Sequence, residues 1–411
     1  MFHSHLVVKL AATLLALAGP LAFAGPPALA AAAAAAEPAP TPCPSLAVGR
    51  PGASATPAPP ALEQSRREVG GAALATSGLA TPPEAPVPPK VTATSWLVAD
   101  LTSGDVLGAC GPHEYAVPAS VQKLLLAAAV LPKLDPQQVV QVTREDLDYE
   151  PGSSSMGLVE GGRYTVETLW LGLLLNSGND AANVLARLGG GTGDVRGGLA
   201  AMNAKAEELG AYQTHAATPS GLDGPGQYTS AYDLALIARA CFAQEDFRRY
   251  AATRSAQVPA QPAQKAEGYE IFNDNQLLHR YPGALGGKTG FTDLARHTYV
   301  GAAERDGRRL VVTLLGAEAQ PKSGWEQGAA LLDWGFGLPS TATVGRLVEP
   351  GELTERASPE SAPDEAEKVA AAPVASSPRP GVDLFWPLVA LAVAAAVLFL
   401  VVQVRRRRSR R

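Results

Sequence analysis

Two long stretches without a periodic apolar pattern limit the part of this 411-residue chain that can build a core. Residues 31–90 are dominated by Ala, Pro, Ser and Thr, and residues 339–383 are rich in Ala, Pro and Glu. Neither stretch buries enough apolar surface to offset the entropy of ordering it, so both are predicted to be disordered. One globular domain over residues 91–338 remains, which is long enough for a sizeable core.

The two ends of the chain predict export and anchoring. Residues 1–30 combine an apolar stretch with small residues at its end, which is typical of a cleaved signal peptide, although an uncleaved anchor is the alternative. Residues 384–404 carry no charge and are long enough to cross a bilayer as a helix. The basic tail at 405–411 holds six arginines and is expected on the cytoplasmic side, which places the domain outside the cell with residues 339–383 as its tether.

Net charge and cysteine spacing limit which partners, metal sites and disulfides the chain is expected to have. The formal net charge is −5, which argues against nucleic acid as a partner. The three cysteines show no metal-ligand spacing. In an oxidising compartment Cys110 and Cys241 could form a disulfide, or both could be separate buried thiols; either interpretation leaves Cys43 unpaired in the first linker.

The domain reads as a mixture of strands and helices. A hairpin is predicted at residues 95–108 and a second one at 297–316, where Asp306-Gly307 is a strong turn signal. Between the hairpins, and once after them, apolar residues recur at helical spacing, which predicts helices at 121–130, 165–175, 180–188, 200–209, 230–242 and 323–336. This order favours an α+β fold in which an antiparallel sheet joins the first and last strands and a helical block lies beside it.

Ser120 and Lys123 open the first apolar helix and share one of its faces. A serine hydroxyl needs a base to become a good nucleophile, and an amine in a dry pocket can act as that base. The helix N-terminus offers free N–H groups to a developing oxyanion. Taken singly, the pair has a plain alternative, in which Ser120 only caps the helix.

Two further short motifs follow. The segment Asn176–Asp180 interrupts two helices, and it either presents Ser177 and Asn179 to a site or is an ordinary capped turn. The segment Gly286–Gly290 lets a ligand approach the backbone and supplies Lys288 as a cation for a carboxylate. The spacing of a phosphate loop fails, because Pro282 stands where its first glycine should be.

The three motifs in this order, Ser-x-x-Lys, Ser-x-Asn and Lys-Thr-Gly, resemble those of penicillin-binding proteins and serine β-lactamases. The segments 177–182, 221–234, 273–278 and 286–293 are similar to the low-molecular-mass D-alanyl-D-alanine carboxypeptidases of peptidase family S11. The resemblance implies a serine β-lactamase/penicillin-binding-protein-like α+β fold. It also implies peptidoglycan stem peptides as substrates, β-lactam antibiotics as covalent inhibitors, and no metal or organic cofactor.

The resemblance also implies roles for single residues. Ser120 would be the nucleophile, Lys123 the general base and Ser177 a proton relay. The substrate would be bound by Asn179, Lys288, Thr289 and Gly290, and the oxyanion by the backbone N–H groups of Ser120 and Phe291. The family's common second β-rich domain is absent or vestigial here, and residues 384–404 are expected to span the bilayer rather than lie on it.

Other functions remain open at this stage. A class A β-lactamase is disfavoured, because no glutamate between the second and third motifs lies in a Glu-x-x-Leu-Asn motif. A transpeptidase would share every motif with a carboxypeptidase and differ only in passing the acyl group to an amine rather than to water. An endopeptidase would also share every motif and differ in the peptide that donates the acyl group. A non-catalytic peptidoglycan-binding protein would be expected to lose a motif residue, and all are intact.

Overall fold

The computed structural model describes residues 39–49, 59–61 and 63–353 of the chain. Among these residues no helix is long and apolar enough to cross a membrane. The predicted signal peptide at 1–30, the predicted spanning helix at 384–404 and the basic tail at 405–411 lie outside the described residues.

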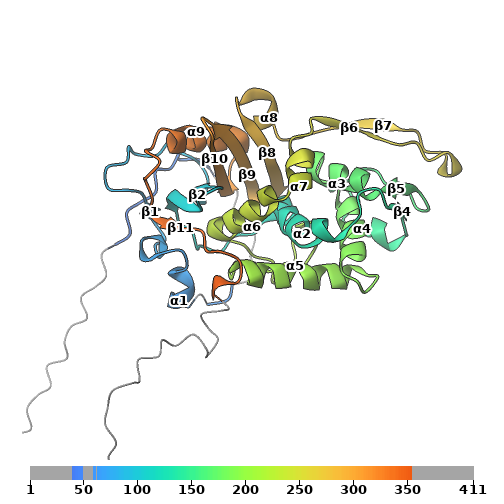
Figure 1. Ribbon diagram of the computed structural model, residues 1–411, viewed down its shortest axis with the longest axis horizontal. Coiled ribbons are helices and arrows are strands. Elements are labelled where there is room, and N and C mark those ends of the chain that lie inside the picture. Colours follow the sequence, from blue (N-terminus) through green and yellow to red (C-terminus); the bar gives the residue numbers. More distant parts are fainter. Residues whose placement is uncertain (1–38, 50–58, 62, 354–411) are drawn as a thin grey trace, which may run out of the picture. The chain divides into compact units, whose positions relative to one another are not determined.

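A seven-stranded antiparallel sheet forms the centre of the domain (Figure 1), with the order β1-β3-β2-β10-β9-β8 and β11 paired to β3. Its strands are β1 (Leu79–Ala80), β2 (Ser95–Asp100), β3 (Asp105–Cys110), β8 (Ala284–Thr292), β9 (Arg296–Arg305), β10 (Arg308–Ala317) and β11 (Gly345–Arg346). The predicted pairing of the first and last hairpins is confirmed, because β2 lies beside β10 with Val98 opposite Val312. Asp306 and Gly307 form the predicted tight turn, both with positive φ.

Helices cover both faces of this sheet (Figure 1). Helix α9 packs on one face over β9 and β10, and α6 packs on the other face over β10 and β2. The α-helices are α1 (Gln64–Arg67), α2 (Lys123–Val130), α3 (Val166–Leu175), α4 (Asn179–Gly189), α5 (Val195–Leu209), α6 (Ala231–Ala243), α7 (Glu245–Ala251), α8 (Leu277–Arg280) and α9 (Gly324–Phe336). The short 3₁₀ helices are η1 (Ala72–Leu74), η2 (Ala119–Gln122), η3 (Leu131–Lys133), η4 (Glu145–Leu147) and η5 (Pro262–Gln264).

Apolar side chains form two cores, one on each side of the sheet. The smaller core lies between the sheet and α9 and includes Trp96, whose ring meets Trp334 edge to face. The larger core joins the other face to the helical subdomain of α2 to α6, where every residue of α2 is buried. Helix α2 is apolar all round because neighbouring elements enclose it completely. The α+β fold with a helical subdomain is therefore as predicted.

Two small two-stranded sheets lie outside the central sheet, and the sequence patterns did not predict either. Strands β4 (Val139–Gln141) and β5 (Arg163–Thr165) pair with each other, as do β6 (Ser255–Val258) and β7 (Tyr269–Phe272). Figure 1 shows the β6–β7 arm reaching over α3. These strands are short and partly exposed, so they lack the apolar alternation that marks a strand in a sequence.

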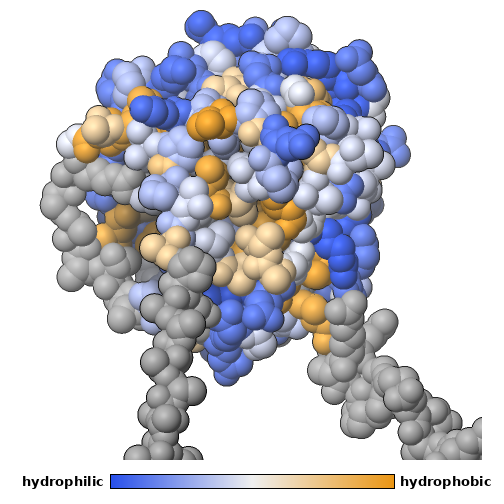
Figure 2. Space-filling model, turned by 90° about the vertical axis from the view of Figure 1, so that its left-hand side faces the viewer, coloured by the Kyte–Doolittle hydropathy of each residue, from blue (hydrophilic) through white to orange (hydrophobic). Residues whose placement is uncertain are grey.

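The prediction of disorder over residues 31–90 is wrong for its second half. Residues 63–90 form α1, η1 and β1, and β1 adds to the edge of the sheet beside β3. The domain also continues past residue 338, since β11 pairs with β3 and Leu347 is buried. Figure 2 views the side of the domain on which α1, β1 and β11 lie, and apolar residues gather there in the middle of a largely hydrophilic face.

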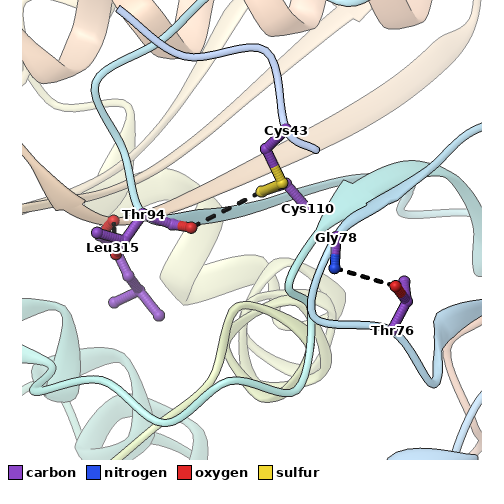
Figure 3. Close-up of a disulfide and its surroundings, with 6 residues drawn as sticks. All are labelled: Cys43, Thr76, Gly78, Thr94, Cys110 and Leu315. Atoms are coloured by element: carbon purple, nitrogen blue, oxygen red, sulfur yellow. Dashed lines mark hydrogen bonds between the residues drawn. A yellow bond between two sulfur atoms is a disulfide. The ribbon is translucent and has the colours of Figure 1, made fainter. Parts of the chain in front are cut away.

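The disulfide prediction is also wrong, because Cys110 pairs with Cys43 rather than with Cys241 (Figure 3). Cys241 is a free thiol, buried in α6 against the carbonyl of Leu124. Cys241 lies in the core between the sheet and the helical subdomain, whereas Cys110 contributes to the core on the opposite, α9 side of the sheet. The bridge fastens residues 39–49, which we call the N-terminal strap, to β3, and Leu46 N–H donates to the carbonyl of Val91 beside it.

Candidate active site

Ser120 lies in the short 3₁₀ turn η2, immediately before α2 begins at Lys123. The Nζ of Lys123 is 2.8 Å from the Oγ of Ser120. Ala119 has a φ of 50°, an uncommon conformation that is costly outside glycine and that often accompanies functional sites. The Oγ1 of Thr298 on β9 donates to the carbonyl of Pro118 at 2.8 Å and so ties this turn to the sheet.

Lys123 is completely buried and fully hydrogen-bonded. Besides Ser120, its Nζ lies 2.7 Å from the Oδ1 of Asn179 and 2.7 Å from the carbonyl oxygen of Ser220. Burial, and next the positive charge of Lys288, hold the pKa of Lys123 well below its usual value, while Asp180 opposes the shift. A lysine in this state is readily neutral, which a general base requires.

Ser177 lies in the turn between α3 and α4 with a φ of 66°. Its Oγ is buried and makes no hydrogen bond to another atom of the described chain. A buried hydroxyl of this kind carries an unused donor and acceptor, which a substrate group can satisfy. The strained turn keeps Ser177 beside Asn179, which itself contacts Lys123.

The carboxylate of Asp180 fixes the loop that faces this turn. It accepts hydrogen bonds from the backbone N–H groups of Met156 and Leu158, both at 2.9 Å. The same loop brings the Oγ of Ser153 to 2.9 Å from the Nδ2 of Asn179. No role was predicted for Asp180 beyond its place in the second motif and in the capped-turn alternative, and Ser153 was not predicted at all. Ser153 carries no motif of its own, and only the tertiary fold brings it to Asn179.

The third motif lies on β8, an edge strand of the sheet. Lys288 is 1% exposed, and its Nζ donates to the carbonyl of Thr289 at 2.8 Å. Burial lowers the pKa of Lys288 to about 8, and the negative charge of Asp274 partly opposes that shift. The lysine is thus a cation at neutral pH in a dry environment, where attraction to a carboxylate is strong. Thr289 beside it is only half-buried.

Gly290 is required by the close approach of β8 to the turn that holds Ser120. A Cβ at this position would lie 2.8 Å from the backbone N of Ser120 and 2.4 Å from Thr298 Oγ1. Phe291 follows with 49% of its side chain exposed and its ring against that of His297. The residues of all three motifs therefore meet where β8 faces the start of α2.

No group of three or more His, Cys, Asp or Glu side chains in the described ranges is arranged to hold a metal ion. The chemistry available at this site comes from a hydroxyl against a lysine of lowered pKa, a second hydroxyl, an amide and a cation. That combination suits acyl transfer to a serine and recognition of a substrate that ends in a carboxylate.

Comparison with known proteins agrees with this geometry. The family model described as D-alanyl-D-alanine carboxypeptidase, peptidase S11, matches residues 82–319. The D-alanyl-D-alanine carboxypeptidase DacB2 of Mycobacterium tuberculosis is 47% identical over 264 residues, which cover 63% of this chain and 87% of that protein. DacD of Salmonella typhimurium is 36% identical over 61% of this chain, and the match spans 64% of that protein's length.

Solved structures of similar fold include enzymes of the same kind. A crystal structure of a D-alanyl-D-alanine carboxypeptidase from Mycobacterium tuberculosis superposes with a TM-score of 0.61 at 44% identity, covering 65% of this chain and 99% of the other. A Streptomyces DD-transpeptidase superposes with a TM-score of 0.58 at 27% identity, covering 61% of this chain and 99% of the other.

Fold and site together define a serine acyl-transfer enzyme related to the penicillin-binding proteins. The chain belongs to the D-alanyl-D-alanine carboxypeptidases of peptidase family S11. It is a serine-type D-Ala-D-Ala carboxypeptidase of peptidoglycan processing, whose substrates are peptidoglycan peptides and which binds β-lactams.

Proposed function

We propose that Ser120 is the nucleophile of this carboxypeptidase and that Lys123 is its general base. The observation that carries the proposal is the 2.8 Å contact between Lys123 Nζ and Ser120 Oγ, made by a fully buried lysine whose pKa is lowered. Lys123 takes the hydroxyl proton as Ser120 Oγ attacks the carbonyl between the two D-alanines. The peptide bond then breaks, terminal D-alanine leaves, and water hydrolyses the acyl-enzyme ester.

Ser177 and Asn179 serve the leaving group and the substrate backbone. The otherwise unpaired Ser177 hydroxyl relays a proton to the departing amine of D-alanine. Asn179 holds an amide of the stem peptide, and its contacts with Lys123 and Ser153 fix its orientation before the substrate arrives.

The β8 residues bind the end of the substrate. Lys288 and Thr289 receive the terminal carboxylate, and Gly290 lets the peptide lie along the strand. The N–H groups of Ser120 and Phe291 form the oxyanion hole, where a single donor contributes about 3–4 kcal/mol in other acyl-transfer enzymes.

The sequence supports a location for this reaction. We infer that residues 1–30 direct export, that residues 384–404 anchor the protein in the cytoplasmic membrane, and that the domain acts at the outer face. The Cys43–Cys110 disulfide is in keeping with an oxidising compartment. Protease protection of the basic tail, but not of the domain, in intact cells would test this orientation; a domain protected in intact cells would contradict it.

A second activity shares the acyl-enzyme. The similar Streptomyces protein is named a DD-transpeptidase, and transpeptidation differs only in using an amine as acyl acceptor. Release of D-alanine in the absence of an added amine indicates hydrolysis, whereas release that requires an added amine indicates transpeptidation.

The full chain and its Ser120→Ala variant test the proposal. Both are incubated with a fluorescent penicillin and with a pentapeptide that ends in D-Ala-D-Ala. We expect labelling and D-alanine release from the wild type and neither from the variant, with unchanged thermal unfolding. Labelling that persists in the variant would show that another residue is the nucleophile.

A further inference from the structure

Residues 153–158 run along the second motif and are bonded to it at several points. The Nδ2 of Asn179 donates to the Oγ of Ser153 at 2.9 Å, and the backbone N–H of Asn179 donates to the carbonyl of Ser154 at 3.0 Å. The Oδ1 of the same asparagine accepts from Lys123 at 2.7 Å. The position of this segment therefore helps to set the orientation in which Asn179 meets Lys123.

The β6–β7 arm holds the same segment from outside the motif. The hydroxyl of Tyr269 on β7 donates to the carbonyl of Met156. The N–H of Met156 donates to the Oδ1 of Asp180 at 2.9 Å, so Met156 links the arm to the second motif. Gly157 follows with a φ of 78°, and a Cβ at that position would lie 2.5 Å from the Tyr269 hydroxyl oxygen. Arm and segment are therefore in direct contact.

The arm itself is fixed at its base and at its tip. At the base, the Nδ2 of Asn273 donates to the carbonyl of Thr253 at 2.9 Å, and Ile271 is buried in the larger core. At the tip, the side chain of Gln261 accepts from the N–H of Arg163 at 2.8 Å and donates to the carbonyl of the same residue at 3.0 Å. Figure 1 shows the arm passing over α3. A hydroxyl on an arm held in this way can keep a neighbouring carbonyl in one place.

Tyr269 contributes little to the apolar cores. Its side chain is 39% exposed and belongs to neither of the two core clusters. Burial of the hydroxyl nevertheless raises the pKa of Tyr269 to about 12, so the group remains a donor at neutral pH. A tyrosine whose ring is largely outside the core and whose hydroxyl reaches a loop of the site is suited to positioning rather than to packing.

We propose that Tyr269 is a positioning residue for the second motif, and that it acts through Met156 and residues 153–158 on Asn179. The inference rests on the proposed function, in which Asn179 holds an amide of the stem peptide and contacts the proposed base Lys123. Without the Tyr269 hydroxyl the segment loses one of its supports, and Asn179 is held less firmly against Lys123. Substrate binding and proton transfer then both weaken, although no group that touches the substrate has been changed.

Tyr269→Phe in the full chain tests the proposal, because it removes the hydroxyl and keeps the ring. We expect kcat/KM for a pentapeptide that ends in D-Ala-D-Ala to fall by about threefold to tenfold, the size of one hydrogen bond. Tyr281→Phe is the matched control, since its hydroxyl donates to the Oδ1 of Asp333 on α9 at 2.8 Å. The control loses a hydrogen bond of the same kind away from the second motif and should keep the wild-type kcat/KM.

The pH profile separates positioning from a simple loss of folded protein. Lys123 donates to three acceptors, and one of them is the Oδ1 of Asn179. A weaker contact with Asn179 stabilises the ammonium less, which lowers the pKa of Lys123 and moves the acid limb of kcat/KM to lower pH by about half a unit. The charged groups that act on Lys123 are Lys288 on β8 and Asp180 on α4, and both are the same in the two proteins. A loss of folded protein scales the whole profile and leaves the acid limb in place.

The outcomes are distinguishable. A lower kcat/KM with a displaced acid limb in Tyr269→Phe, and neither effect in Tyr281→Phe, supports the proposal. Unchanged kcat/KM in a folded Tyr269→Phe protein overturns it, and so do equal effects in both variants. A lower kcat/KM with an unmoved acid limb also overturns it, because the contact between Asn179 and Lys123 is then intact. A folded wild type that neither labels with benzylpenicillin nor releases D-alanine refutes the proposed function, and this inference with it.

Discussion

Gly290→Ala tests how the fold positions Ser120, the proposed nucleophile. The new Cβ would lie 2.8 Å from the Ser120 backbone N, and ordinary contact begins near 3.4 Å, so strand and turn must separate by about 0.6 Å (3.4 minus 2.8). The Cβ would also lie 2.4 Å from Thr298 Oγ1, on the residue that ties Pro118 to the sheet. Overpacking of this kind costs about 1–3 kcal/mol of unfolding free energy.

The same displacement acts directly on the proposed oxyanion hole. Its two N–H donors belong to Ser120 and Phe291, on either side of the contact that the methyl group would force open. Misplacement of reacting groups by about 1 Å costs on the order of a hundredfold in rate, so we expect benzylpenicillin acylation to slow by about tenfold to a hundredfold.

Stopped-flow kinetics measures the rate of benzylpenicillin acylation, and urea unfolding measures the loss of unfolding free energy. Gly224→Ala is the matched control, because a Cβ there meets nothing closer than 3.5 Å and should change neither quantity much. Wild-type acylation by a folded Gly290→Ala protein would refute the argument that this close approach sets the geometry of the site.

Three further predictions follow from the same contacts. The kcat/KM should fall at acid pH as Lys123 becomes protonated, and KM should rise above about pH 8 as Lys288 loses the proton that gives it its charge; a flat profile across pH 8 would contradict the role of Lys288. Asp180→Asn replaces one of the two carboxylate oxygens with an NH2 group, so one of the backbone N–H groups of Met156 and Leu158 loses its acceptor. The change should cost about 1–3 kcal/mol in urea unfolding and lower kcat/KM, whereas unchanged unfolding would show that the loop is held by other contacts. Cys43→Ser opens a loop whose ends are 67 residues apart and should lower the unfolding free energy by about 4 kcal/mol. Under reducing conditions the wild type loses the same bridge, so the two proteins should then unfold with equal free energy. A variant that is still less stable than the reduced wild type would point to another cause.

The sequence predicts that Ser120 and Lys123 lie together because the two residues belong to one short, local motif. Ser120 and Lys123 are three residues apart, so their proximity follows from helical geometry alone, and the structure places their side chains 2.8 Å apart. The contact between Lys123 and Asn179 spans 56 residues, and only the family resemblance assigned both residues to one site.

The parts that the sequence did not predict depend on tertiary contacts without a local signal. Ser153 and the Ser220 carbonyl reach the site from loops whose residue types suit any exposed turn. The N-terminal strap is held by one disulfide and a few backbone hydrogen bonds, and its composition matches that of a disordered linker. For Cys43, composition favoured disorder, and only the fold shows that it lies against β3.

The most direct test of the central claim is to locate the covalent adduct. The full chain is acylated with benzylpenicillin and digested, and the modified peptide is sequenced by mass spectrometry. The account predicts one adduct, on Ser120, that Lys123→Ala slows by orders of magnitude without loss of folding. An adduct on Ser177 or on any other residue would contradict it.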